Sequence, residues 1–185
     1  MANIFHYIYF RLLKWSHEVT VPRREKCIIC VAPHTSNWDF IIGELYFHGI
    51  GRRAMFLMKR FWFFWPLGVL LRKMGGIPVQ RTRQCSLTDH LAAEAIKRDE
   101  FVLAVTPEGT RSKVEQWKRG FYYIAQKAQI PIQLYAIDYA RKRIVCTQEI
   151  VPSERVETDM RAIMAYYAQY SDAGKYPEQF IVESQ

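Results

Sequence analysis

Residues 27–49 read CIICVAPHTSNWDFIIGELYFHG and decide how the rest of the chain is interpreted. The first six, CIICVA, form an unbroken apolar run of strand length, which is typical of a strand buried on both faces of a sheet. PHTSN follows as a loop, and WDFIIGELYFHG predicts a helix that ends at Gly49 or Gly51. A strand, a loop and a helix in this order form the repeating unit of an α/β fold.

The same alternation continues downstream. Short apolar runs predict strands at residues 54–58, 77–80, 101–105 and 132–137. Helical spacing of apolar residues predicts helices at residues 87–98, 120–129 and 159–170. Residues 143–150 are expected to pair with 132–137 as a hairpin. With no internal repeat or linker, residues 1–185 predict a single α/β domain with a mostly parallel central sheet flanked by helices, antiparallel at one edge.

Composition limits the classes of protein to which the chain belongs. Its 185 residues suit one domain, and 50% hydrophobic with 24% charged residues is typical of a globular rather than a disordered protein. Two values are unusual, namely a formal net charge of +8 and an aromatic content of 15%. A basic, aromatic-rich domain favours anionic and partly apolar partners, and membrane surfaces and nucleic acids both meet this description.

Residues 1–20 are expected to form an amphipathic N-terminal helix. Its apolar face would carry six side chains: Ile4, Phe5, Ile8, Tyr9, Leu12 and Leu13. Arg11 interrupts the apolar stretch and no small-residue cleavage site follows, so we expect no cleaved signal peptide. The longest uncharged apolar run, residues 61–71, contains a proline and is much shorter than the roughly 20 residues of a spanning helix. We therefore predict no transmembrane helix.

Four cysteines occur in the chain, and two of them, Cys27 and Cys30, are spaced as CxxC. They lie within the predicted buried strand, whereas redox pairs usually lie at a helix N-terminus and a zinc site needs a second pair of ligands. We interpret them as buried structural thiols and expect no metal. Thiols of this kind fit a reducing compartment.

His34 and Asp39 stand on either side of the predicted loop-to-helix boundary. If the loop folds back over the first helical turn, the carboxylate reaches one ring nitrogen of the imidazole. It then fixes the tautomer and supports the charge that forms when the other nitrogen takes a proton. This arrangement makes His34 a candidate general base. Alternatively, Ser36 and Asp39 form a helix capping box, in which Asp39 bonds a backbone N–H.

A second group of polar residues, TPEGTRS over 106–112, follows the predicted strand 101–105 directly. Gly109 allows a close backbone approach, Thr110 and Ser112 offer hydroxyls, and Arg111 offers a fork of donors that suits phosphate. The alternative is an ordinary Pro-Glu-Gly turn with solvated flanks. Both this loop and PHTSN lie at the carboxyl ends of predicted strands, where open α/β sheets bind their ligands.

The four segments HTSNWD, GGIPVQR, PEGTRS and IPIQLYAI occur in this order and together resemble the sequence blocks of PlsC-type glycerolipid acyltransferases. The family's His-x4-Asp box falls on His34 and Asp39, and its other blocks fall on residues 76–81, 107–112 and 130–137. The resemblance covers roughly residues 27–140 and implies a fold like that of glycerol-3-phosphate acyltransferase.

The resemblance implies an enzyme like 1-acylglycerol-3-phosphate acyltransferase, which moves an acyl group from acyl-CoA or acyl carrier protein to a lipid hydroxyl. It implies His34 as the base, Asp39 as its orienting partner, and Arg81, Glu108 and Gly109 near the acceptor's head group. We add Thr110 and Arg111 to this substrate-binding set because their side chains suit an anion. The thioester is already activated, so no cofactor or metal ion is expected.

Some positions depart from the family pattern and leave the acceptor open. Pro33 stands where many members carry asparagine, and Leu134 stands where a second proline is frequent. Residues 176–180, YPEQF, resemble the end of the lipid A acyltransferases. The sequence therefore leaves open lysophosphatidic acid, other lysophospholipids, amino-acid-derived lipids and lipid A precursors.

Residues 59–73 suggest how the protein reaches a lipid. Basic residues flank an aromatic centre, which consists of Phe61, Trp62, Phe63, Phe64 and Trp65. Tryptophans suit the headgroup boundary and the flanking cations suit anionic lipids, so we expect a peripheral protein on the cytoplasmic side of a membrane. The alternative is a core helix whose aromatic side chains fill the domain.

Two other functions remain as alternatives. A hydrolase such as a thioesterase would use the same site with water in place of the lipid hydroxyl, although the chain has no G-x-S-x-G elbow. A nucleic-acid-binding module would also use basic and aromatic residues. Here the aromatic residues are concentrated in an apolar run and no RNA-binding signature is present, so we expect no nucleic-acid partner.

Overall fold

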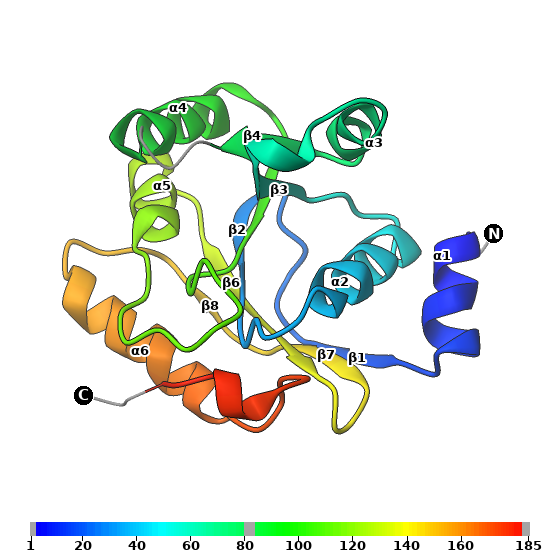
Figure 1. The fold of residues 1–185 in the computed structure, drawn as a ribbon. Coiled ribbons are helices and arrows are strands. Elements are labelled where there is room, and N and C mark those ends of the chain that lie inside the picture. Colours follow the sequence, from blue (N-terminus) through cyan, green and yellow to red (C-terminus); the bar gives the residue numbers. More distant parts are fainter. Residues whose placement is uncertain (1–2, 80–83, 183–185) are drawn as a thin grey trace.

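A computed structural model of the chain describes residues 3–79 and 84–182 (Figure 1). Within these residues the strands form one eight-stranded mixed sheet in the order β1-β7-β6-β2-β5-β3-β4, with β8 also beside β6. The strands are β1 (Ser16–Val19), β2 (Lys26–Val31), β3 (Met55–Lys59), β4 (Gly76–Val79), β5 (Phe101–Val105), β6 (Ile132–Asp138), β7 (Arg143–Cys146) and β8 (Glu149–Ile150). The single α/β domain and mostly parallel sheet expected from the sequence are thereby confirmed.

Helices cover both faces of this sheet. The α-helices are α1 (Ile4–His6), α2 (Trp38–Gly49), α3 (Leu67–Lys73), α4 (Gln84–Lys97), α5 (Gly120–Ala128) and α6 (Val156–Ala168). Shorter turns are the π-helical η1 (Tyr7–Leu12) and the 3-10 helices η2 (Arg60–Trp62) and η4 (Pro177–Gln179). Figure 1 shows α4, α5 and α6 on one side of the sheet, and α2 with the N-terminal helix on the other.

The central strand β2 shows why CIICVA lacks the alternation of a half-exposed strand. Ile28 and Cys30 belong to the core beneath α4, α5 and α6, whereas Cys27 and Ile29 belong to the core beneath α2. All four side chains are 0% exposed. Because side chains alternate between the faces of a sheet, a strand covered on both faces must be apolar at every position.

The register of the parallel strands brings the two sequence motifs together. β2 pairs with β5 in parallel, with Cys30 opposite Val105. The two strands therefore end at the same edge of the sheet. The loop that holds His34 and the loop that holds Glu108 leave from adjacent positions there, which is the edge where open α/β sheets bind ligands.

Most predicted elements are present, and the hairpin of residues 143–150 with β6 is confirmed, since β7 and β8 both pair antiparallel with β6. The N-terminus differs from expectation. The helix expected over residues 1–20 ends at Leu12, and Ser16–Val19 instead forms β1 at the edge of the sheet. Its expected apolar face is also not a single buried face, because Tyr9 is buried while Ile4 and Leu12 are each 64% exposed.

The helices in the described part of the chain are too short or too polar to cross a membrane.

Candidate active site

The backbone between β2 and α2 turns His34 back toward the first turn of α2. His34 lies in the loop after β2, and Asp39 is the second residue of α2. The imidazole Nδ1 lies 3.0 Å from Asp39 Oδ2, so the expected histidine–aspartate pair is formed. Five positions along a regular helix would place the two side chains on different faces, so the pair depends on the non-helical conformation of the loop.

The carboxylate of Asp39 is almost completely buried, at 4% exposure, and receives four hydrogen bonds. Oδ2 accepts from His34 Nδ1 and from the backbone N–H groups of Thr35 and Ser36, each of the latter at 2.9 Å. Oδ1 accepts from the hydroxyl of Tyr139 at 2.7 Å. These donors compensate the carboxylate for its removal from water. The bond to Ser36 N–H is one half of the expected capping box, whereas the Ser36 hydroxyl accepts from Trp38 N–H at 3.2 Å rather than from Asp39 N–H.

The second ring nitrogen of His34 is available for chemistry. The imidazole is 19% exposed, and no hydrogen bond from Nε2 to another residue is present within 3–79 and 84–182. With Nδ1–H donating to Asp39, Nε2 carries the lone pair. A nitrogen held in this way accepts a proton from a hydroxyl that approaches from solvent.

Glu108 ties the second motif loop to the first. Its Oε1 accepts the backbone N–H of His34 at 2.9 Å, and the residue is only 3% exposed. The pKa of this carboxyl is raised to about 8, mainly by burial and also by the negative charge of Asp39, while the hydrogen bond from the His34 N–H opposes the shift. Glu108 therefore fixes the position of the His34 backbone, a contact that the sequence did not reveal.

The other predicted substrate-binding residues lie around this loop. Gly109 is exposed with φ +64°, a conformation that suits glycine, and Lys118 packs against it. Thr110 Oγ1 accepts from the N–H of Ser112 at 3.4 Å, and the exposed Arg111 guanidinium donates to Asn37 Oδ1. Arg81 lies outside the described residues. For all of these residues, binding of an acceptor head group stays a prediction.

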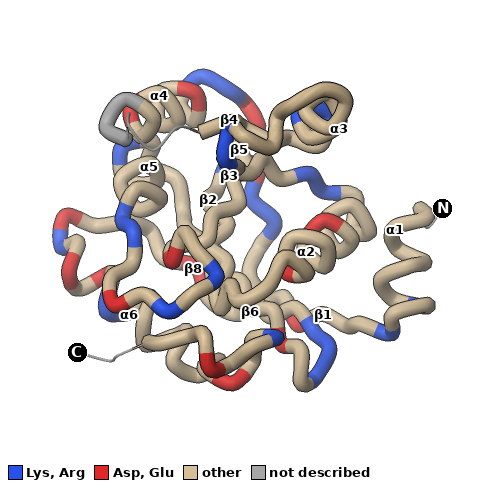
Figure 2. The backbone as a smooth tube through the Cα atoms, in the orientation of Figure 1, with Lys and Arg blue, Asp and Glu red and all other residues tan. Residues whose placement is uncertain are grey.

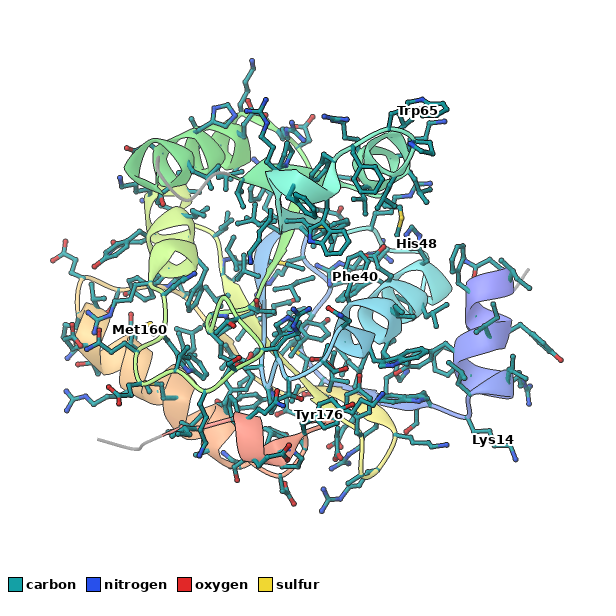
Figure 3. The ribbon with its side chains drawn as sticks, viewed as in Figure 1. Lys14, Phe40, His48, Trp65, Met160 and Tyr176 are labelled. Atoms are coloured by element: carbon teal, nitrogen blue, oxygen red, sulfur yellow. The ribbon has the colours of Figure 1, made fainter. Side chains whose placement is uncertain are left out.

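A segment near the C-terminus, Ala173–Phe180, packs on the loop that holds His34 and was not assigned to the site from the sequence. The N–H of Tyr176 donates to Thr35 Oγ1 at 3.2 Å, and the carbonyl of Ala173 accepts from the N–H of Tyr139 at 2.9 Å. Gly174 packs so closely on Thr35 that a Cβ there would lie 3.0 Å from Thr35 Oγ1. Figure 3 shows Tyr176 beside the red turn η4, on the side of the molecule where β7 lies.

The aromatic segment of residues 61–65 is not part of the core. Its exposed side chains are Phe61 at 78%, Trp62 at 47%, Phe64 at 53% and Trp65 at 83%. Phe63 is half-buried and lies under the Arg72 guanidinium, 5.3 Å from the ring centroid. Figure 3 shows Trp65 at the outer end of the α3 region, away from the sheet. The alternative of a core helix filled by these rings is therefore wrong.

The CxxC cysteines are buried thiols, as predicted. Cys27 and Cys30 are unpaired and fully buried, and burial raises the pKa of Cys27 to about 11 and that of Cys30 still further. Protonated thiols of this kind are poor nucleophiles and poor metal ligands. Among the residues that the structure describes, no three His, Cys, Asp or Glu side chains are grouped as metal ligands.

Comparison with protein families agrees with this geometry. The acyltransferase family model matches residues 15–138, a range that contains the loop of His34, the first turn of α2 and the loop of Glu108. A comparison with curated proteins finds no match. Because the family match spans more than half of its length, the chain belongs to the acyltransferase family, that of the PlsC-type acyltransferases.

Proposed function

We propose that the protein is a membrane-peripheral O-acyltransferase that moves a fatty acyl group from acyl-CoA or acyl carrier protein to a hydroxyl of a lysophospholipid or related lipid. The observation that carries this proposal is the His34–Asp39 pair with Nε2 of His34 left open, in a chain of the acyltransferase family. A lipid hydroxyl is a weak nucleophile at neutral pH and needs such a base.

The proposed reaction has one proton to move. His34 Nε2 takes the proton of the acceptor hydroxyl while its oxygen attacks the thioester carbonyl. The new C–O bond forms, the C–S bond breaks, and the proton passes from His34 to the leaving thiolate. Asp39 stabilises the imidazolium between these steps through the Nδ1–H bond of 3.0 Å. No covalent enzyme intermediate is required because the acyl group arrives as an activated thioester.

The exposed aromatic segment supports the membrane part of the proposal. Tryptophan and phenylalanine rings gain free energy at the headgroup boundary, and they are exposed here beside four exposed cations, namely Lys59, Arg60, Arg72 and Lys73. Each cation near an anionic leaflet contributes about 1 kcal/mol. In this proposal the enzyme binds the cytoplasmic leaflet, where its lipid substrates are held.

The experiment is an acyl-transfer assay with purified protein, acyl-CoA or acylated carrier protein, and a panel of lysolipids. We expect transfer to at least one acceptor, and His34→Ala should lower kcat by ~10²–10⁴-fold, the usual contribution of a general base. His48→Ala is the matched control, because His48 also pairs with a carboxylate, Glu44, at 3.3 Å but lies at the other end of α2. It should retain activity.

Two results would contradict the proposal. Full activity of the His34→Ala variant would show that His34 is not the base. Release of free fatty acid at a rate independent of every acceptor would instead indicate a thioester hydrolase.

A further inference from the structure

Tyr139 continues the line of hydrogen bonds that begins at His34. Its hydroxyl donates to Asp39 Oδ1 at 2.7 Å, and Asp39 Oδ2 accepts from His34 Nδ1 at 3.0 Å. The three side chains come from three separate parts of the chain, namely the loop after β2, the first turn of α2, and the residue after β6. Tyr139 lies one position beyond the region that matches the acyltransferase family model.

The two oxygens of Asp39 have unequal surroundings. Oδ2 receives three hydrogen bonds, from His34 Nδ1 and two backbone N–H groups, whereas Tyr139 is the donor to Oδ1 among residues 3–79 and 84–182. A buried oxygen without a donor costs about 1–3 kcal/mol, more when it is charged. The Tyr139 hydroxyl therefore both compensates Oδ1 and limits rotation of the carboxylate plane.

The position of Tyr139 is itself fixed from two sides. Its ring packs edge-on against Trp15, with 5.2 Å between ring centroids, and its backbone N–H donates to the carbonyl of Ala173. Burial raises the pKa of its phenol well above the ordinary value, and the negative charge of Asp39 raises it further, so the hydroxyl keeps the proton that it donates. Glu108 and Tyr176 are the other titratable groups close to this pair.

We propose that Tyr139 is a positioning residue of the acyl-transfer site, which acts through Asp39 to hold the carboxylate in the orientation that His34 requires. The proposal rests on the proposed function. Tyr139 donates to Asp39 and does not touch the reacting atoms. Without its bond, Oδ1 loses its donor and the negative charge of the carboxylate is less dispersed. The remaining charge then favours the imidazolium form of His34, the form that is unable to act as a base.

The experiment compares Tyr139→Phe with Tyr122→Phe. Tyr122 is a matched control because its hydroxyl also donates to a partly buried carboxylate. The acceptor is Asp159 Oδ2 at 2.6 Å, away from His34. Tyr139→Phe should lower kcat by ~10-fold, leave KM within twofold, and move the acidic limb of the pH–rate profile to higher pH. Tyr122→Phe should change the melting temperature and leave both kinetic quantities as they are.

A readout without turnover separates this proposal from the proposed function. In NMR spectra, the His34 ring signals are identified as those that disappear in His34→Ala. These signals should titrate at higher pH in Tyr139→Phe than in the unmodified protein. That shift would support the proposal even if no acyl transfer were found. An unchanged His34 titration would overturn it, and so would a kcat loss that only parallels a fall in melting temperature with no change in the pH profile.

Discussion

At the scale of single residues, Asp39 combines a hydrogen bond at the start of α2 with a hydrogen bond to the candidate base His34. Its Oδ2 accepts from Ser36 N–H at the start of α2 and from His34 Nδ1. The first N–H groups of a helix have no partners within the helix, so a carboxylate placed there is stabilised before any catalytic use. The bond from Asp39 to a backbone N–H and the pairing with His34, both expected from the sequence, are therefore formed, and a catalytic role of Asp39 stays a prediction.

Glu108 leads to a prediction about stability and pH. Its pKa is about 8 in the folded chain and 4.5 ordinarily, so the folded state retains a proton that the unfolded state has released between these values. The free energy of unfolding therefore falls as pH rises from about 4.5 to 8 because of this group. Glu108→Gln removes the ionisation. The melting temperature of the variant minus that of the unmodified protein should increase from pH 5 to pH 9 by roughly 3 °C or more.

Thermal unfolding at pH 5, 7 and 9 tests this expectation. Glu115→Gln is the control because Glu115 is exposed on the loop that follows Glu108. The difference in melting temperature between this variant and the unmodified protein should be the same at all three pH values. Glu44, whose pKa burial raises to about 7, is present in every variant and cancels from the comparison. If the difference in melting temperature between Glu108→Gln and the unmodified protein did not change with pH, the raised pKa of Glu108 would be contradicted.

At the scale of secondary-structure elements, the sequence was sufficient to predict the bounds of an element where the apolar pattern agreed with the residues that mark its two ends. β5 and α2 begin and end at the residues expected, since each is an apolar run bounded by polar residues or glycine. β1 was missed because its four residues are mostly exposed and pair on one side only, with β7. In η1 the hydrogen bonds join residues five apart, as from Leu13 N–H to Ile8 C=O. The apolar face predicted with 3.6 residues per turn was therefore wrong there.

Residues of the site were predictable to the extent that they lie in one short segment. His34 and Asp39 belong to a single loop and helix turn, and their pairing follows from the sequence near them. Tyr139 and Tyr176 reach the same site only through the order of the strands and the path of the chain after α6. No local pattern carries that information.

The close contact of Gly174 with Thr35 gives a prediction at this scale. A Cβ at residue 174 would lie 3.0 Å from Thr35 Oγ1 and 3.1 Å from its Cγ2, so Gly174→Ala must displace the loop of His34 or the segment Ala173–Phe180. We expect kcat to fall ~3–10-fold, because small displacements of catalytic groups are costly. The acyl-transfer assay measures this change.

Gly43→Ala provides the comparison. Gly43 lies in α2 and a Cβ there would meet nothing within 4 Å. The free energy of unfolding should rise by roughly 0.5–1 kcal/mol, as expected for glycine to alanine in a helix, and kcat should not change. Equal kinetics in the two alanine variants would show that the contact with Thr35 does not affect the site.

At the scale of the whole molecule, the excess of aromatic and basic residues is partly localised. The most exposed aromatic side chains lie in residues 61–65, whereas basic residues occur on many elements (Figure 2). A surface that attracts anionic lipids through charge and retains them through rings should respond to both salt and ring removal. The aromatic content of 15% thus includes rings that lie outside the core.

Co-sedimentation with vesicles of phosphatidylglycerol and phosphatidylcholine tests this distribution. Replacing Phe61 and Trp65 together by serine should weaken vesicle binding by more than ~10-fold, since both rings are largely exposed and available to the bilayer. Raising the salt concentration should weaken binding of the unmodified protein. Ile96→Ser removes another exposed apolar side chain, 62% exposed, from α4 and should leave binding unchanged. Unaltered binding of the double variant would refute the membrane role of this segment.

The contact between Tyr176 and Thr35 joins positions 141 residues apart, which has a consequence for biosynthesis. Ribosomes add ~5–20 residues per second, so about 7–30 s separate the translation of Thr35 from the translation of Tyr176. During this interval a nascent chain already contains His34 and Asp39 but lacks the segment that contacts Thr35 and Tyr139. The surroundings of the His34 loop are therefore complete only after residues 173–180 have left the ribosome, later than β2 and α2.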